Sequence, residues 1–201
     1  DQEVYRHPKV KKATVGSGIR YDLFLHDCTP EENQAMGYDE YFRQLVTRHV
    51  SGRLKVAPEH TSDAVLKLMR KPSFAMFVKL KKKFDAINEK EHLNQQLIPY
   101  FISSHPDCYL EDMADLAVKT KALGYHLEQV QDFTPTPMTL ATEIYYSGYN
   151  PYTLEPVFVA KSKEEKLVQQ RFFFWYKPEN REWAKSMLKR LGHPDWIKKL
   201  F

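Results

Sequence analysis

The sequence predicts an α/β protein in which short parallel strands alternate with helices, followed by a helical C-terminal segment. Strand-like runs recur near positions 12, 55, 99 and 128, and a helical pattern separates each from the next. Polar segments with glycine or proline follow these runs, as expected where parallel strands end in one mouth. The composition changes after Asn150. We therefore predict part of a TIM-type barrel over 1–150 and an extension packed on it over 151–201.

Composition narrows the class of protein. The 201 residues are 42% hydrophobic, enough to bury a core, and the net charge of +4 comes from 30 basic and 26 acidic residues that are interspersed. No apolar run approaches the roughly 18 residues of a membrane span, and the N-terminal stretch is no secretory signal. Cys28 and Cys108 are too few and too far apart for a cysteine zinc cluster or a redox pair. We expect reduced thiols, a cytoplasmic location, no membrane partner, and a fragment of a longer protein.

The first predicted strand lies around Lys12–Val15, and Gly16-Ser17-Gly18 breaks it. This loop can place backbone donors and Arg20 against an anionic group, but as a plain turn it requires no ligand. We expect a loop over Asp27–Gly37. A helix follows over Tyr38–Val50, because apolar residues recur there at helical spacing.

The second predicted strand is Arg53–Ala57, and polar residues follow its carboxyl end. Ser62 is suited to cap the next helix, and a longer helix runs over Phe74–Lys90. Glu59 and His60 stand between the strand and the helix, a position favoured for ligand contacts. An ordinary surface pair of a carboxylate and an imidazole explains them equally well.

The third predicted strand, Gln96–Ser104, is apolar enough to be covered on both faces. His105-Pro106-Asp107 stops it, and a helix is expected over Glu111–Leu123. A fourth strand is expected over Tyr125–Gln131. Each helix between strands is long enough for a right-handed crossover.

A loop stiffened by Pro135 and Pro137 follows the fourth strand, because proline lacks a backbone donor and has a fixed φ. Thr139 is suited to cap a helix over Leu140–Tyr146, which Gly148 would end. A strand that ends in a rigid polar loop is a common ligand position in α/β proteins. A structural connector between strand and helix is the alternative.

The C-terminal segment has a different character. Glu155–Ala160 is expected to be extended, and Ser162 with Glu165 fits a capping box. The helix that follows runs into the aromatic block Arg171–Tyr176, which we expect to pack on the core. A last helix is expected over Pro178–Leu191.

Taken together, these strand ends resemble the C-terminal half of a radical S-adenosylmethionine (SAM) protein of the uncharacterised YgiQ type, and more distantly the tRNA methylthiotransferases. The matching segments are Val15–Leu23, Leu54–Met69, Leu97–Met113 and Phe133–Thr142. The resemblance covers nearly the whole chain, and it implies a half TIM-type barrel with a C-terminal extension. Members of that family hold a [4Fe–4S] cluster and SAM, and they cleave SAM to a 5′-deoxyadenosyl radical.

The chain departs from that pattern in two ways. It lacks the CxxxCxxC loop whose three thiolates hold the cluster, so the cysteines would precede Asp1. Ser104, Asp107 and Met138 also stand where relatives often carry glycine. We therefore expect this chain alone to be inactive and to bind neither cofactor, with both belonging to the longer parent.

The resemblance also assigns site residues. It implies that Glu59 and His60 approach the SAM ribose, that Ser104 lies near the adenosyl group and Phe133 near the adenine. Local chemistry adds four candidates for contact with an unknown substrate, and these are Ser17, Arg20, Gln129 and Gln131. No catalytic acid or base and no metal ligand is assigned within the chain.

Two other functions are consistent with the residues. One is a non-catalytic binding or RNA-contacting domain on a barrel scaffold, suggested by Lys79–Lys83 and Arg171–Tyr176. The other is an ordinary TIM-type enzyme with Glu59 and His60 as acid and base. For partners, we expect the N-terminal half of the same barrel, or self-association through an open sheet edge.

Overall fold

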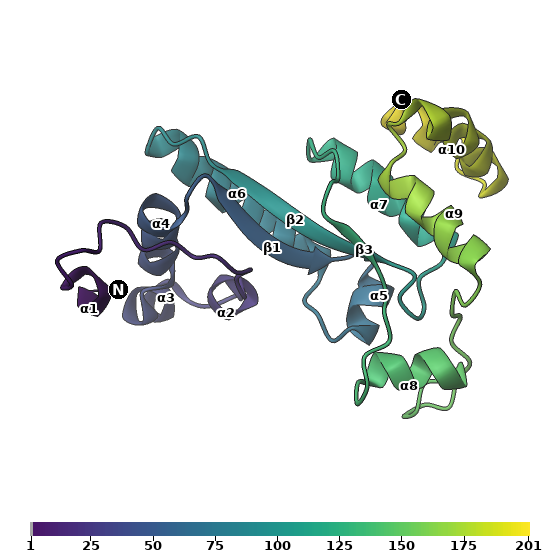
Figure 1. Ribbon diagram of the computed structural model, residues 1–201, viewed down its shortest axis with the longest axis horizontal. Helices are drawn as coiled ribbons and strands as arrows, with labels where there is room; N and C mark the ends of the chain where they lie inside the picture. Colours follow the sequence, from purple (N-terminus) through teal and green to yellow (C-terminus); the bar gives the residue numbers. More distant parts are fainter. Residues whose placement is uncertain (1) are drawn as a thin grey trace. The chain divides into compact units, whose positions relative to one another are not determined.

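A computed structural model of the protein describes residues 2–201 (Figure 1). The chain divides into two compact units. The first unit comprises residues 2–57 and 75–99, and the second unit comprises residues 58–74 and 100–201. In the part of the chain that is described, no helix combines the length and the apolar character needed to cross a membrane.

A three-stranded sheet confirms the predicted α/β class. Its strands are β1 (Arg53–Glu59), β2 (Gln96–Ser103) and β3 (Val130–Asp132), in the order β1-β2-β3. The strands are parallel, and the β2–β3 register places Phe101 opposite Val130 and Ser103 opposite Asp132. Buried side chains alternate along β1 and β2, as the two-residue period of a strand requires.

The strand predicted around Lys12–Val15 is wrong. This segment has no regular structure, and the amide N–H of Val15 donates to the carbonyl of His49 at 2.9 Å. A single parallel bridge joins Ile19 to Val56 farther along. A segment becomes a strand only where it hydrogen-bonds to a neighbouring strand. Here the residue that pairs with β1 is Ile19, which follows Gly16 and Gly18, and not Lys12–Val15.

The first unit also holds five helices. They are α1 (Gln2–Tyr5), α2 (Asp22–Leu25), α3 (Pro30–Met36), α4 (Tyr38–His49) and most of α6 (Phe74–Lys90). Helices α4 and α6 confirm the predicted helical periods. Phe42, Phe77, Leu80 and Phe84 are fully buried on them and form the core of this unit.

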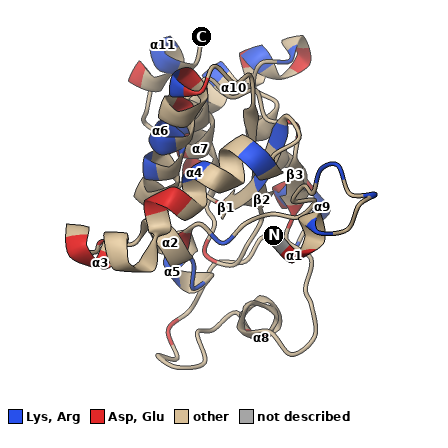
Figure 2. Cartoon of the chain, turned by 90° about the vertical axis from the view of Figure 1, so that its left-hand side faces the viewer, with Lys and Arg blue, Asp and Glu red and all other residues tan. Residues whose placement is uncertain are grey.

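Helix α3 overturns the loop predicted over Asp27–Gly37. The hydroxyl of Thr29 accepts from the amide N–H of Glu32 at 3.2 Å, and Pro30 occupies the first turn. Gly37 ends the helix with a φ of 68°. Its acidic first turn (Figure 2) also complements the helix dipole, so local capping outweighs the lack of apolar residues.

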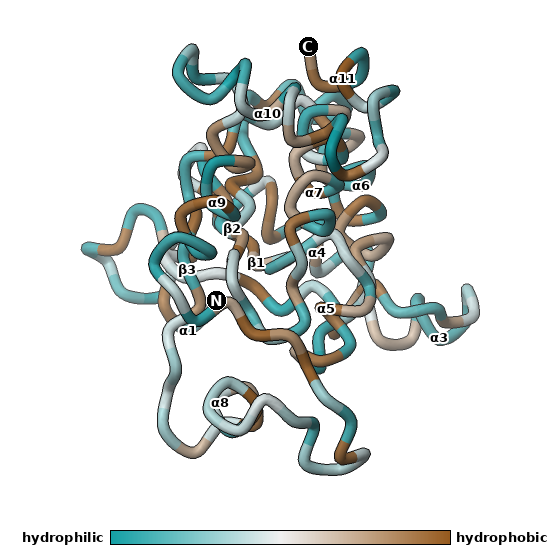
Figure 3. The backbone as a smooth tube through the Cα atoms, turned by 90° about the vertical axis from the view of Figure 1, so that its right-hand side faces the viewer, coloured by the Kyte–Doolittle hydropathy of each residue, from teal (hydrophilic) through white to brown (hydrophobic). Residues whose placement is uncertain are grey.

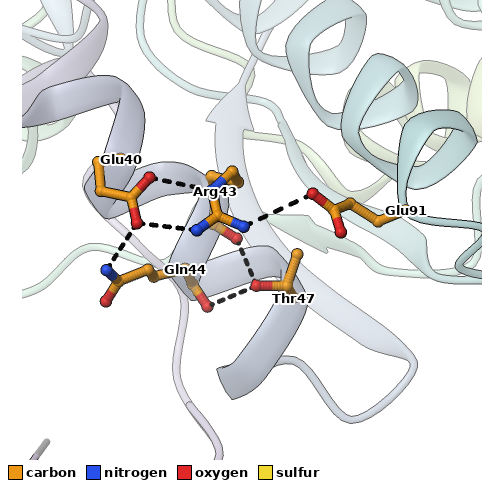
Figure 4. A network of polar contacts seen from close by, with 5 residues as sticks. All are labelled: Glu40, Arg43, Gln44, Thr47 and Glu91. Carbon is orange, nitrogen blue, oxygen red and sulfur yellow. Dashed lines mark hydrogen bonds and ion pairs between the residues drawn. The ribbon is translucent and has the colours of Figure 1, made fainter.

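A polar network joins α4 to the end of α6 (Figure 4). The guanidinium of Arg43 donates twice to the carboxylate of Glu40, both at 2.9 Å, and lies 3.5 Å from the carboxylate of Glu91. These side chains are partly exposed to water, which screens the ion pairs, so the network orients the side chains more than it stabilises the fold.

The second unit contains six helices, and Figure 1 shows α7, α9 and α10 close together near the C-terminus. They are α5 (Asp63–Leu68), α7 (Leu110–Ala122), α8 (Leu140–Ser147), α9 (Lys163–Phe173), α10 (Pro178–Arg190) and α11 (Asp195–Leu200). Helix α9 contacts α7, α10 and β3. Five of these six helices were predicted from the sequence, and α11 was not.

Two predicted caps form in this unit, whereas the side chain of Ser62 makes no cap hydrogen bond at the start of α5. The hydroxyl of Thr139 accepts from the amide N–H of Thr142 at 3.3 Å, and Gly148 ends α8 with a φ of 75°. The hydroxyl of Ser162 and the carboxylate of Glu165 form the predicted reciprocal capping box of α9.

Two extended segments are shorter than predicted. Of Tyr125–Gln131, only the last two residues are in β3, because the amide N–H of Tyr125 bonds to the carbonyl of Thr120 at the end of α7. Over Glu155–Ala160 there is one antiparallel bridge, between Tyr149 and Pro156.

The aromatic block packs in the core of the second unit, as predicted. Phe172 and Phe173 are fully buried at the end of α9, and Trp175 is 7% exposed. The hydroxyl of Tyr176 donates to the carbonyl of Leu127 at 3.1 Å. Hydrophobic and hydrophilic residues alternate along α9 (Figure 3), so one face covers the core and the other faces water.

Candidate ligand pocket

A pocket of about 390 Å³ lies within the second unit at the carboxyl ends of the strands. Its wall includes the last residue of β1, the ends of β2 and β3, the end of α5, and the proline loop with the start of α8. This is the position at which parallel sheets bind ligands. The wall carries two carboxylates, a guanidinium, an ammonium, an imidazole, an amide, a phenyl ring and threonine hydroxyls.

Glu59 and Lys71 form one wall of the pocket. The carboxylate of Glu59 lies 3.1 Å from the ammonium of Lys71, and its side chain is 15% exposed. Glu59 has a φ of 66°, in the left-handed region that L-residues rarely adopt. Such conformations persist where the surrounding structure holds them, and they are common at functional sites.

Asp132 lies at the opposite wall, at the end of β3. Its carboxylate accepts a hydrogen bond from the hydroxyl of Ser103 on β2 and another from the amide of Gln170 on α9. Two donors from different elements fix this carboxylate in one orientation. Asp132 therefore ties β3 to β2 on one side and to the C-terminal helices on the other.

The proline loop forms the rim of the pocket. The carbonyl of Thr136 accepts from the hydroxyl of Thr139 at 2.9 Å and from that of Thr142 at 2.7 Å. Thr134, Thr136 and Thr139 line the pocket, while Met138 next to them is fully exposed. Internal hydrogen bonds and two prolines therefore hold this rim in a defined shape.

His105 lies just past the end of β2 and also lines the pocket. Its side chain is 4% exposed, and its Nδ1 lies 2.8 Å from the carbonyl oxygen of Pro106. The ring meets that of Phe133 nearly edge-on, with centroids 5.0 Å apart. Burial lowers the pKa of His105 below its usual value, so the ring is neutral at pH 7.

His60 begins a buried polar network that does not reach the pocket wall. Its Nδ1 accepts from the amide N–H of Ser62 at 3.0 Å, so Nε2 carries the proton and faces the Cys108 sulfur at 3.5 Å. The thiol of Cys108 in turn donates to the Gln169 side chain at 3.3 Å. Burial is the main cause that lowers the pKa of His60 to about 3, and repulsion from His105 when both rings are protonated acts in the same direction.

Gln169 on α9 completes this network. Its Oε1 accepts from the amide N–H of Ser104 at 2.7 Å, and its Nε2 donates to the carbonyl of Cys108 at 2.7 Å. Gln169 is 3% exposed, so these are buried hydrogen bonds. The amide thereby holds both ends of the loop that carries His105. The hydroxyl oxygen of Ser104 is buried and has no partner within the described residues.

The structure brings together some of the predicted site residues. Glu59, Phe133 and Gln131 line the pocket. His60 and Ser104 are buried beside it without lining it. Their assignment to SAM stays a prediction.

Three further candidates lie outside the pocket. The carbonyl of Gln129 accepts from Phe101 on β2, and its side chain is not in the wall. Ser17 and Arg20 belong to the first unit, where Ser17 is exposed and the guanidinium of Arg20 pairs with the carboxylate of Asp22. Their contact with a substrate stays a prediction.

Four residues that line the pocket, or hold a lining residue in place, were not among the predicted site residues. These are His105, Asp132, Lys71 and Gln170. For His105 a signal existed, because it directly follows the predicted strand Gln96–Ser104. For Gln170 no local signal existed, because its partner Asp132 is 38 positions away.

The described residues do not fit an iron–sulfur cluster. Cys28 is in the first unit and Cys108 is in the second, and within residues 2–201 no three His, Cys, Asp or Glu side chains are grouped to hold a metal ion. The pocket wall carries the carboxylates of Glu59 and Asp132, the cations of Arg70 and Lys71, and the ring of Phe133.

The residues that suggested an RNA surface have partners within their own units. In the first unit, Lys79, Lys81 and Lys83 pair with Asp27, Asp85 and Asp39. In the second unit, the guanidinium of Arg171 donates to the Asn180 side chain and covers the ring of Trp183. Neither set offers a row of free cations beside exposed aromatic rings.

Comparison with known proteins places these features in a larger context. Residues 128–199 match a family described as "Domain of unknown function (DUF3362)". The match covers the end of the sheet, the proline loop and helices α8 to α10, together with most of α11. It therefore includes Asp132, Phe133 and Gln170 of the pocket region.

Three relatives illustrate the similarity along the whole chain. The UPF0313 protein of Bacteroides thetaiotaomicron is 62% identical over 96% of this chain, and that of Porphyromonas gingivalis is 58% identical over all of it. The UPF0313 protein of Methanocella arvoryzae is 44% identical over 97% of the chain. In each case the chain spans about 31% of the length of the relative. The chain is thus similar, over nearly all of its own length, to about a third of a UPF0313 protein.

Proposed function

We propose that these 201 residues are the C-terminal part of a radical SAM barrel and its extension, within a protein about three times as long. The observation that carries the proposal is the pocket at the carboxyl ends of the parallel strands. Three residues that the resemblance and local chemistry assign to SAM or substrate, Glu59, Phe133 and Gln131, come from three separate segments and line it.

Within this proposal, the residues of the chain bind and orient a nucleoside and hold water away from it. Glu59, held by Lys71, accepts hydrogen bonds from sugar hydroxyls, and Phe133 packs against the base. Gln131 faces the substrate from the exposed side of β3. When bound, SAM supplies an adenosyl radical after one-electron reduction, and the cluster for that reduction is held outside these residues.

His60 and Ser104 have a supporting part in this proposal. Both are buried beside the pocket, and the network through Cys108 and Gln169 connects them. They fix the position of the segments that follow β1 and β2. In this proposal both residues are neighbours of the cofactor and do not contact it directly.

The partner in this proposal is the rest of the same protein. Strands β1 and β3 are the two edges of the described sheet, and each presents backbone groups that another strand can pair with. In the longer protein, the N-terminal half of the barrel would occupy such an edge. The isolated chain is expected to self-associate instead, which sedimentation at several concentrations would measure.

The experiment uses the longer protein, with the residues upstream of this segment present. It is reconstituted with iron and sulfide without oxygen, mixed with SAM and a reductant, and analysed for 5′-deoxyadenosine. We expect the product to form, and Glu59→Gln and Phe133→Leu to weaken SAM binding by about 10-fold, the loss of one good contact. Exposed Thr153→Ser serves as the control variant.

A protein that binds neither cluster nor SAM would contradict this proposal. A non-catalytic binding domain would then be the better interpretation, and RNA is the first ligand to test. Binding to RNA that weakens steeply with salt would support that alternative. An activity that needs neither iron nor anaerobic handling would instead indicate an ordinary barrel enzyme.

A further inference from the structure

Helix α8 and the segments on either side of it expose large side chains. Only Ile144 of the helix is buried, and α8 extends away from the sheet and from α7 and α10 (Figure 1, Figure 3). Met138, just before the helix, is fully exposed, and Tyr146 and Tyr152 are 70% and 72% exposed. Single exposed apolar side chains are common on proteins, but a group of them that lies together indicates an interaction site.

These side chains do lie together. Met138, Tyr146 and Tyr152 line one hollow of about 550 Å³, and Arg70 lies in the same wall. We call these four residues the tyrosine surface. Most of the side chains that line the hollow are exposed, so it is an open surface and not an enclosed pocket for a small molecule. It therefore suits a partner that is itself a surface.

Arg70 has a fixed place in the tyrosine surface. Its guanidinium donates to the hydroxyl of Tyr152 at 3.0 Å and lies 5.5 Å from the centre of that ring. Among residues 2–201 no carboxylate pairs with Arg70, whereas the neighbouring Lys71 pairs with Glu59. Glu143 in the same wall likewise pairs with no cation of the described chain. The surface thus keeps a cation and a carboxylate available to a partner.

The composition of the surface indicates the class of partner. Tyrosine, methionine and arginine are enriched at the cores of protein–protein interfaces, and tyrosine and arginine often carry much of the binding energy there. A single-stranded nucleic acid would need an excess of cations beside the rings. In the wall of this hollow Arg70 is matched by Glu143, so there is no such excess. A protein surface is therefore the better match.

The place of the surface and the length of the relatives indicate which protein this is. Arg70, Thr139 and Leu140 line both this hollow and the pocket at the strand ends, so a partner seated here lies beside the mouth of the pocket. The chain spans about 31% of each of the three relatives, so more than half of such a protein lies outside these residues. Another part of the same protein is then available to cover the surface.

We propose that the tyrosine surface is the docking site for another segment of the same polypeptide, one that lies outside these 201 residues in the longer protein. That segment presents apolar side chains to Tyr146 and Tyr152 and an oxygen acceptor to Arg70. The inference rests on the proposed function only in taking the chain to be part of a longer protein. Because both partners belong to one polypeptide, the docking does not depend on protein concentration.

The first test measures how accessible the tyrosines are in the longer protein. N-acetylimidazole acetylates tyrosine hydroxyls, and mass spectrometry of the peptides locates the modified residues. The rate at each tyrosine is compared with its rate in the same protein unfolded in urea. We expect Tyr146 and Tyr152 to react at least about 10-fold more slowly in the native protein, because the core of an interface excludes the reagent.

Two outcomes of this test would overturn the inference. Rates close to those in urea would mean that the surface is open to water in the longer protein. Slow rates that become fast when the protein is diluted would mean that a second copy covers the surface, since docking within one polypeptide does not change on dilution.

The second test loosens the docking with a substitution and uses Tyr146 as the reporter. In the longer protein, we expect Tyr152→Ala to speed acetylation of Tyr146 about 10-fold, roughly the effect of one central interface side chain. Arg70→Gln should act in the same direction. Thr153→Ser, at the exposed neighbouring position, should leave the rate unchanged. Because Tyr146 is already exposed within its own unit, its rate can rise only if another segment had covered it. An unchanged rate in both Tyr152→Ala and Arg70→Gln would contradict the inference.

These outcomes are independent of radical chemistry. Formation of 5′-deoxyadenosine by the longer protein tests the proposed function, whatever covers the tyrosines. If that product forms but Tyr146 and Tyr152 react as in urea, the docking inference is wrong and the proposed function stands. If both tyrosines are protected but no product forms, the docking surface stands without the proposed reaction.

Discussion

Three residues near the pocket adopt a backbone conformation that favours glycine. Ser104, Asp107 and Met138 have φ values of 60°, 68° and 65°. These are the three positions at which the family resemblance leads one to expect glycine. The structure therefore gives a physical reason for that expectation, because an L-residue in the left-handed region carries about 1–2 kcal/mol of strain. In this chain the pocket loops keep their shape without glycine.

Met138 offers a direct measurement of that strain. Its side chain is fully exposed, so removing it costs no packing. We expect Met138→Gly to raise the free energy of unfolding by about 0.5–1 kcal/mol, since relief of strain exceeds the entropy that glycine adds to the unfolded chain. Urea unfolding followed by tryptophan fluorescence measures the change. Met138→Ala is the control, because alanine keeps the strain, and an equal gain from alanine would contradict this account.

The two cysteines provide a second prediction for single residues. Cys108 is fully buried, and burial raises the pKa of its thiol, with the negative charge of Asp112 acting in the same direction. Cys28 is partly exposed. We expect a thiol reagent to modify Cys28 in the native protein at least about 100-fold faster than Cys108, because a buried neutral thiol must first be exposed.

The variants Cys28→Ser and Cys108→Ser assign the two rates. Loss of the fast phase is expected only in Cys28→Ser. Fast labelling of Cys108 in the native chain would mean that the loop after β2 opens readily, and that the network from His60 to Gln169 does not hold it.

Helix α9 is the element that connects the C-terminal segment to the pocket. Two neighbouring residues on it reach different strand ends, because Gln169 binds the loop after β2 and Gln170 binds Asp132 at the end of β3. The predicted capping box of Ser162 and Glu165 fixes where the helix begins, and so sets which residues face the sheet. The C-terminal helices therefore support the pocket as well as packing beside it.

Replacing Gln169 tests this role. Gln169→Ala leaves the amide N–H of Ser104 and the carbonyl of Cys108 buried without partners, and each unsatisfied group costs about 1–3 kcal/mol. We expect the free energy of unfolding to fall by about 2–4 kcal/mol. Glu164→Ala, at an exposed position of the same helix, should change it by less than about 0.5 kcal/mol. Similar values for both variants would mean that the amide does not hold the loop.

The elements show what the sequence can predict and what it cannot. Helices α4, α6 and α9 were predicted because periodicity and capping are local signals. The strand expected at Lys12–Val15 failed because a strand depends on a partner that the local sequence does not name. Helix α3 was not predicted because it has no buried apolar residues, and only its cap and its proline mark it as a helix.

At the scale of the whole molecule, the pocket also has features that the local sequence predicts and features that depend on tertiary contacts. The positions just after strands pointed to Glu59, Gln131 and Phe133 because strand order alone brings such ends together. The hydrogen bond between Asp132 and Gln170 joins residues 38 positions apart, and no local pattern indicates it. Which residues line the wall and which lie behind it likewise depends on tertiary packing. That packing separated Glu59 from its neighbour His60.

The second unit holds two buried neutral histidines, so its stability should depend on pH. The pKa of His60 is about 3 in the folded protein, against an ordinary value of 6.5, and that of His105 is also lowered. Below pH 6.5 the unfolded state therefore binds more protons than the folded state. The free energy of unfolding then falls as the pH falls, by about 1.4 kcal/mol per pH unit for His60 until the pH approaches 3.

We expect the free energy of unfolding to be at least about 1.4 kcal/mol lower at pH 5.5 than at pH 7.5, the value for one buried histidine that titrates only when unfolded. Urea unfolding at both pH values measures this difference. His60→Gln should reduce the difference by about that amount, since it removes the titrating ring. His92→Asn, at an exposed position whose φ of 52° suits asparagine, should retain it. An unchanged pH dependence in His60→Gln would mean that His60 accepts its proton in the folded protein, and that the network with Cys108 opens to water.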